Sequence, residues 1–148
     1  MLTRIRVPLN RFYGESSGAV AVEMAVLLPL FVLLVFAIID FGQLYMMDHL
    51  ITNASREGAR YGVVYRVDAN NNPIPPSSQT TQIVEVVNNY LTGLLPSGSW
   101  SVPTPTYDTA TKKLTVRVNA TKTWLGPLSL FLPNPLTISA STTMIWEG

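Results

Sequence analysis

At 148 residues, the chain has room for one small domain and a few accessory segments. It contains no cysteine, which excludes disulfide bonds, cysteine-ligated zinc and thiol catalysis. The formal net charge is +1 at pH 7, and the part from residue 40 onward carries seven acidic and seven basic residues, so no basic patch that would bind nucleic acid is expected.

The apolar residues are concentrated near the amino terminus. The 21 residues 19–39 contain one charged residue, Glu23. As a helix this run would be roughly 30 Å long, which is enough to cross the hydrocarbon core of a bilayer. Pro29 lies inside the run and removes one backbone hydrogen bond, so we expect a kink there. The sequence therefore predicts a single-span membrane protein.

The charges that flank this run predict its orientation. Three arginines precede it, at positions 4, 6 and 11, whereas Asp40 and Asp48 follow it, and the first basic residue after it is Arg56. The positive-inside rule places residues 1–18 in the cytoplasm and residues 40–148 outside. An ordinary cleaved signal peptide is disfavoured, because its apolar region is shorter and ends in a small-residue site, whereas this run ends in Ile-Ile-Asp.

The helical pattern continues beyond the apolar run. We expect one helix from about Ser17 to Tyr65, half in lipid and half in water. On one face of this helix, apolar or small residues recur every three or four positions: Leu44, Met47, Ile51, Ala54, Gly58, Tyr61 and Tyr65. The small residues Ala54, Gly58 and Gly62 form a groove that could receive either a partner subunit or the protein's own sheet.

The rest of the chain predicts a small α+β domain. Prolines at positions 73, 75 and 76 end the long helix, and a short second helix is expected over residues 78–92. A proline-interrupted strand should cover residues 100–107, followed by alternating strands over residues 113–124 and 136–146. The long helix should cover the apolar face of this small antiparallel sheet of about three strands. We expect four aromatic residues in the core: Tyr107, Trp124, Phe131 and Trp146.

Two features that could indicate a metal or catalytic site have simpler explanations. Residues 68–72 resemble the start of a calcium-binding loop, but Pro73 and Gln79 stand where that loop needs glycine and a bidentate glutamate, so we expect a solvated turn. His49 is the one histidine and has no evident partner ligands. Because no nucleophile, base or metal cluster stands out, the sequence predicts a protein that is not an enzyme and uses no cofactor.

Glu23 is the strongest candidate for a functional residue, because placing a carboxylate within an apolar span costs at least a few kcal/mol. If a protease cut after Gly18, Ala19 would become the amino terminus and Glu23 the fifth residue. Glu23 could then compensate the amine of an adjacent subunit when such helices bundle, and the pair would set their axial register. The alternative is that Glu23 lies in the headgroup region and reaches water.

Two motifs at a fixed separation resemble the TadE-like family of pseudopilins, which are minor pilin components of tight-adherence (Tad) pilus systems. The first is Gly18, with a glutamate five residues later and Pro29 in the apolar run. The second motif, Ala-x-x-Glu-Gly-Ala-Arg-Tyr, lies at the end of the helix and comprises Ala54, Glu57, Gly58, Ala59, Arg60 and Tyr61. The resemblance covers about residues 16–64, and the carboxy-terminal part carries no motif that we can match.

The resemblance implies both a processing step and a role. A prepilin peptidase would remove the cytoplasmic leader, residues 1–18, by cutting between Gly18 and Ala19. Residues 19–39 would form the transmembrane half of the helix, residues 40–66 its exported continuation, and residues 67–148 a small outer domain. In the bacterial inner membrane the subunit would meet other pilin or pseudopilin subunits and an assembly platform. It would aid pilus assembly, initiation or tip capping, and so surface adhesion, either within an extracellular pilus after processing or from a position beneath the pilus.

A second function stays open from the sequence. The chain could be a single-pass membrane anchor that does not polymerise and whose outer domain recognises a ligand or a surface. Cleavage after Gly18 and dependence on Glu23 would separate the two functions, because a non-polymerising anchor needs neither.

Overall fold

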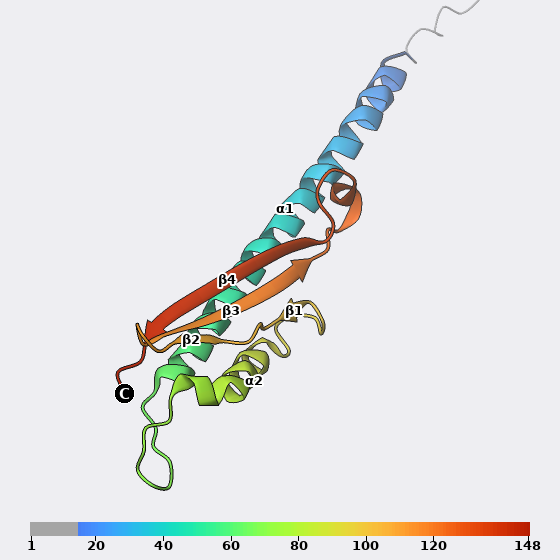
Figure 1. The fold of residues 1–148 in the computed structure, drawn as a ribbon. Helices are drawn as coiled ribbons and strands as arrows, with labels where there is room; N and C mark the ends of the chain where they lie inside the picture. Colours follow the sequence, from blue (N-terminus) through green and yellow to red (C-terminus); the bar gives the residue numbers. More distant parts are fainter. Residues whose placement is uncertain (1–14) are drawn as a thin grey trace, which may run out of the picture.

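The computed structural model describes the backbone of residues 15–148 and the side chains of residues 18–148. Most of the expected leader and the three arginines that precede the apolar run lie outside the described residues. The chain has an α+β fold, as predicted, with a 49-residue helix α1 (Glu15–Val63), a shorter helix α2 (Thr80–Leu91) and a four-stranded antiparallel sheet. Figure 1 shows α1 as a rod whose carboxy-terminal half lies along the sheet and whose amino-terminal end extends beyond it.

Helix α1 runs through Pro29 and ends at Val63. Loss of the backbone hydrogen bond at Pro29 therefore does not end the helix. A kink at this position stays a prediction. The inner face expected from the periodicity is largely correct, since Met47, Ile51 and other members of the pattern are buried. Tyr65 was assigned wrongly, because it lies past the end of the helix and is 59% exposed.

The central strand of the sheet is β3 (Lys113–Lys122). Strand β4 (Leu136–Ile145) pairs with it along its whole length, while β1 (Trp100–Ser101) and β2 (Thr106–Asp108) pair with its two ends on the other edge. Instead of one irregular strand over residues 100–107 there are two short ones, because the prolines at positions 103 and 105 have no N–H to donate to the ladder. The sheet accordingly has four strands and not about three.

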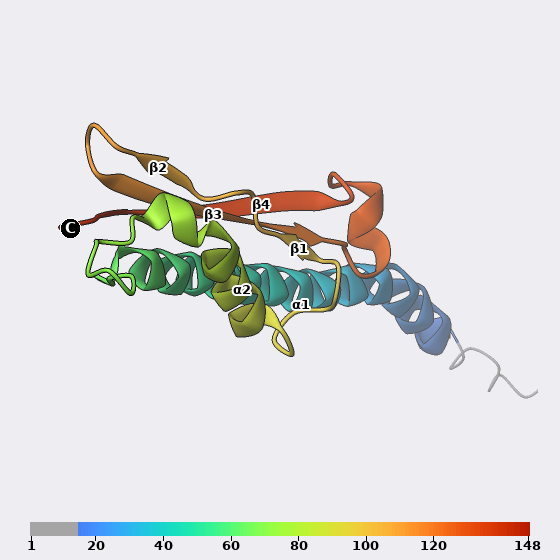
Figure 2. The same ribbon diagram turned by 60° about the horizontal axis from the view of Figure 1, so that its bottom comes forward.

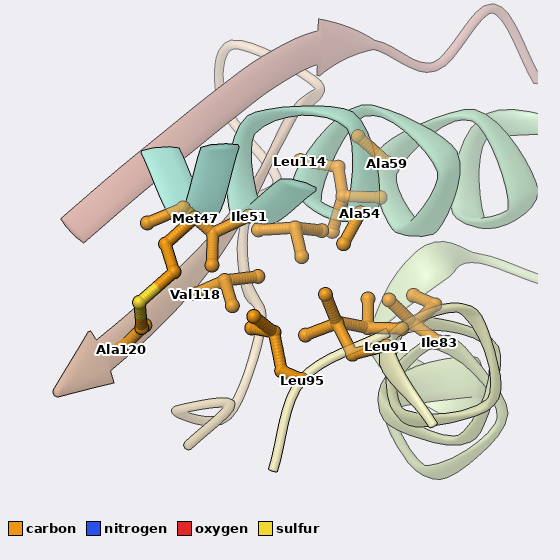
Figure 3. Packing of buried hydrophobic residues seen from close by; sticks show 12 residues of the cluster. Met47, Ile51, Ala54, Ala59, Ile83, Leu91, Leu95, Leu114, Val118 and Ala120 are labelled. Atoms are coloured by element: carbon orange, nitrogen blue, oxygen red, sulfur yellow. The ribbon is translucent and has the colours of Figure 1, made fainter. Parts of the chain in front are cut away.

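The helices form one layer and the sheet forms the other (Figure 2). Alternate residues of β3 point to the helices and are buried, whereas the intervening polar residues point away from the core. Figure 3 shows side chains from α1, α2 and β3 meeting in this core. Its buried members are Met47, Ile51, Ala54, Ala59, Ile83, Val87, Leu91, Leu95, Leu114, Val116, Val118 and Ala120.

Two 3₁₀ turns complete the fold, η1 (Pro76–Gln79) before α2 and η2 (Gly126–Leu130) in the long connection between β3 and β4. Of the aromatic residues expected in the core, Trp124 and Trp146 are buried and Tyr107 is half-buried. Phe131 was assigned wrongly, since it is 73% exposed in the connection that follows η2.

The small-residue groove of α1 is filled by the protein's own domain. A Cβ atom added to Gly58 would lie 2.5 Å from Cγ2 of Val87 in α2 and 3.3 Å from Cγ1 of Val116 in β3. At Gly62, side chains of Leu114 and Ile83 occupy the same space. Of the two occupants that the sequence left open, the structure places the protein's own second helix and sheet in the groove. Glycine allows this close approach because it has no side chain.

We predict that Gly58→Ala lowers the free energy of unfolding of the full chain in detergent micelles by about 1–3 kcal/mol, because the added methyl overpacks the core against Val87. The larger side chain of Gly58→Leu should disrupt packing of the domain altogether. Gly42→Ala is the matched control, because a Cβ there has no atom within 4 Å, and its effect should be neutral or stabilising by up to about 1 kcal/mol. Denaturant unfolding followed by near-ultraviolet circular dichroism measures both. Equal losses in the two alanine variants would contradict close packing at Gly58.

Candidate functional site

The first part of α1 is not covered by any other described part of the chain. Every residue from Gly18 to Val32 is exposed, and we call these residues the uncovered segment. Figures 1 and 2 both show it projecting beyond the domain. Because an apolar surface of this extent is unfavourable in water, lipid or other protein must cover it. Its exposed large side chains are Val20, Val22, Met24, Val26, Leu27, Leu28, Leu30, Phe31 and Val32.

By length and composition, α1 is the one helix among the described residues that could cross a membrane. None of the residues in its most apolar 18-residue window is buried within the chain. This separates it from an apolar helix in the core of a soluble domain, which would be mostly buried. The helix is therefore consistent with membrane anchoring.

Glu23 lies on the uncovered segment with its side chain exposed, and it has no ion-pair partner among the side chains of residues 18–148. Gly18 is exposed too and lies within the first turns of α1, close to its start at Glu15. Within the described part of the chain nothing compensates Glu23, so the compensating group would be water, a lipid headgroup, another subunit or a residue before Gly18. The roles of Gly18 and Ala19 in processing and of Glu23 in helix register stay predictions.

Beyond the uncovered segment, α1 meets the sheet at a buried ion pair that the sequence analysis did not predict. Asp40 is fully buried, Lys122 is 5% exposed, and the Asp40 Oδ1 and Lys122 Nζ atoms lie 2.8 Å apart. It is the only ion pair formed by the side chains of residues 18–148. Because Lys122 is the last residue of β3, the pair joins the helix to the end of the central strand.

The ion pair is also fully hydrogen-bonded. Lys122 Nζ donates three bonds of 2.8 Å each, to the Asp40 carboxylate, the Gln43 side-chain oxygen and the Thr123 carbonyl. The carboxylate of Asp40 accepts a further bond from the N–H of Leu125, with distances of 2.9 and 3.1 Å to its two oxygens. A buried charge is tolerated when it is paired and hydrogen-bonded in this way. The contacts hold α1, the end of β3 and the start of the β3–β4 connection together.

The sequence does contain a signal for this pair. Asp40 precedes Leu44 by four residues and Met47 by seven, which places it on the inner face of α1. Lys122 continues the inward alternation of the buried residues of β3. Two opposite charges at inward-facing positions indicate a buried pair, although from the sequence Asp40 was considered only as a charge that flanks the apolar run.

The motif that closes the helix has two faces. Its small members Ala54, Gly58 and Ala59 are buried against the domain, and Tyr61 is half-buried. Its charged members, Glu57 and Arg60, are exposed on the opposite face. The buried face thus serves the protein's own packing, and the charged face stays available to a partner.

The Asp68 turn is closed by its own hydrogen bonds. The Asp68 carboxylate accepts from the backbone N–H groups of Asn70 and Asn72, each at 2.8 Å, and from the Asn72 side chain. These bonds, chiefly those from Asn72, lower the pKa of Asp68. This is the solvated turn that was expected. His49 is exposed on α1, edge-on to Tyr45, and no group of three or more potential metal-ligating side chains occurs in the described part of the chain.

We predict that Asp40→Asn and Lys122→Met, made separately, each lower the free energy of unfolding by about 3–5 kcal/mol, because each leaves a buried group without its partner. The double variant should lose less than the sum of the two, since no charge is then stranded. Denaturant unfolding in detergent micelles measures this coupling. Lys113→Met is the matched control, because Lys113 is an exposed lysine of the same strand, and its effect should stay within about 0.5 kcal/mol. Additive losses at positions 40 and 122 would show that the two groups do not act as a pair.

The sequence of α1 also matches a known protein family. The family model described as TadE-like protein matches residues 18–60, which include Glu23, Pro29 and the ion-pair residue Asp40. The match ends before α2 and the sheet. Searches of curated proteins and of solved structures found no match. The resemblance carried by the two sequence motifs is therefore confirmed: over residues 18–60, this chain is similar to the TadE-like proteins of Tad pilus systems.

Proposed function

We propose that this chain is a structural minor pilin or pseudopilin of a bacterial Tad-type pilus system. One observation carries the proposal: the domain covers the later part of α1 and leaves residues 18–32 bare. Lipid can cover this apolar segment while the subunit is anchored, and neighbouring helices can cover it after assembly. The match of residues 18–60 to TadE-like proteins supports the same role. In this proposal the protein acts by packing against other subunits and catalyses no reaction.

In this proposal Glu23 sets the register between neighbouring helices. Cleavage between Gly18 and Ala19 by a prepilin peptidase would leave a charged amine at the start of an apolar helix. The carboxylate of Glu23, one turn further along, can pair with the amine of a neighbour that is displaced by about 5.4 Å along the axis. One such pair replaces two separate buried charges, each of which would be costly in a low-dielectric bundle.

The outer domain would follow the position of its helix. Asp40 and Lys122 join α1 to the sheet, and the groove at Gly58 and Gly62 holds α2 and β3 against the same helix. A displacement of α1 in a bundle would therefore displace the domain with it. In this way the register of the apolar helices would determine how the outer domains are spaced along a pilus.

The proposed topology and partners follow from the same scheme. The amino terminus would be cytoplasmic, the outer domain exported, and the helix would stand in the inner membrane beside other pilin subunits and an assembly platform. The subunit would aid assembly or initiation, or would cap the tip. The alternative is a non-polymerising anchor whose outer domain binds a ligand, and that function places no demand on Glu23.

We predict that Glu23→Gln leaves membrane insertion intact but reduces incorporation into pili by about tenfold, which corresponds to about 1.4 kcal/mol of lost pairing. Membrane fractionation and immunoblotting of sheared pili from the native host measure the two quantities separately. Asp48→Asn is the matched control, because Asp48 is an exposed acidic residue of α1 outside the uncovered segment, and it should leave incorporation unchanged. Normal incorporation of the Glu23→Gln variant would contradict the register role of Glu23, whereas absence of the unaltered chain from sheared pili would favour the non-polymerising anchor.

A further inference from the structure

The connection between β3 and β4 exposes apolar side chains in a stretch without charge. Leu130 is 81% exposed, Phe131 is 73% exposed and Leu125 is 44% exposed. No charged residue occurs between Lys122 and Glu147. We call residues 125–133 the apolar loop. A group of exposed apolar side chains of this kind is typical of a surface that contacts lipid or another protein.

The apolar loop lies beside the apolar run of α1. A Cβ atom added to Gly126 would lie 3.2–3.3 Å from ring atoms of Phe36. Phe36 precedes Asp40 by four residues, which is about 6 Å along a helix axis. Figures 1 and 2 both show the loop, drawn in orange and red, next to α1 on the side of the sheet that faces the free amino-terminal end. If residues 19–39 cross a bilayer, the loop lies at the depth of the last turn of the span.

The backbone of the apolar loop is suited to a place with little water. The 3₁₀ turn η2 pairs N–H groups with carbonyls within the loop, and the N–H groups of Phe131 and Leu132 both donate to the Leu128 carbonyl. The Trp124 indole N–H donates to the Pro133 carbonyl at 2.7 Å and closes the loop. At its base, the Leu125 N–H donates to Asp40, whose charge is already paired. These N–H groups are thus paired within the chain, as contact with lipid requires.

We propose that the apolar loop inserts Leu130 and Phe131 into the outer-leaflet boundary of the bilayer that α1 spans. The inference rests on the proposed function, because it requires residues 19–39 to cross the membrane. Lipid is the occupant that fits, since the exposed side chains continue the apolar surface of the span and the loop offers no charge for a polar partner. A helix and a loop that enter the same bilayer side by side would hold the outer domain in one orientation to the membrane before assembly.

The test uses the absence of native cysteine, which lets a single introduced cysteine carry an environment-sensitive fluorophore. The full chain is labelled at Phe131→Cys, at Leu28→Cys in the middle of the expected span, or at Tyr65→Cys. Tyr65 is the matched control, because it is an exposed aromatic residue beyond the far end of α1. Each variant is reconstituted at low density in phosphatidylethanolamine and phosphatidylglycerol vesicles that carry a nitroxide quencher near the headgroup or near the end of the acyl chain.

The proposal expects the probe at position 131 to shift to shorter wavelength and to lose most of its fluorescence to the shallow quencher. The probe at position 28 should be quenched by the deep quencher, and the probe at position 65 by neither. If position 28 is quenched while position 131 behaves like position 65, the span stands and the loop inference is wrong. If position 28 is not quenched, the anchoring fails and the loop inference with it. Protection of position 131 only at high protein density would mean that a second copy covers the loop, which also overturns the proposal.

Discussion

The buried ion pair between Asp40 and Lys122 is the contact on which the arrangement of this molecule depends. It joins α1 to the end of β3, near the place where the helix changes from a bare apolar rod to one side of a domain core. Desolvation offsets much of the attraction in such a pair, but moving either partner away would leave a buried charge uncompensated. The pair therefore favours one position of the sheet along the helix, and the apolar loop is attached at the same point through Leu125.

A single helix therefore serves two environments. Its later half is built into the core through close contacts at Gly58 and Gly62, while its first half is left for lipid or for neighbouring helices. Since α1 is continuous from Glu15 to Val63, the position of one half determines that of the other. This is a suitable construction for a subunit whose proposed role is to present an outer domain at a spacing set by helix packing.

The sequence predicted the parts of the fold that depend on local periodicity. The three- and four-residue spacing gave the inner face of α1 from Met47 to Gly58, and alternation gave the inward residues of β3 and β4. It did not give contacts between distant segments, because periodicity shows which way a side chain points but not what it meets. For that reason the partner of Asp40 was missed and the occupant of the groove at Gly58 was left open. Phe131 was misplaced because an apolar loop and an apolar core have the same composition.

If the uncovered segment is a pilin helix, its amino terminus is made by cleavage and not by translation. The most direct measurement is the intact mass of the chain purified from its native host. A chain that begins at Ala19 is the predicted result, and it would put a charged amine within one helical turn of Glu23. A chain that retains residues 1–18, in cells whose prepilin peptidase is active on other substrates, would contradict the pilin role and leave a membrane-anchored binding protein.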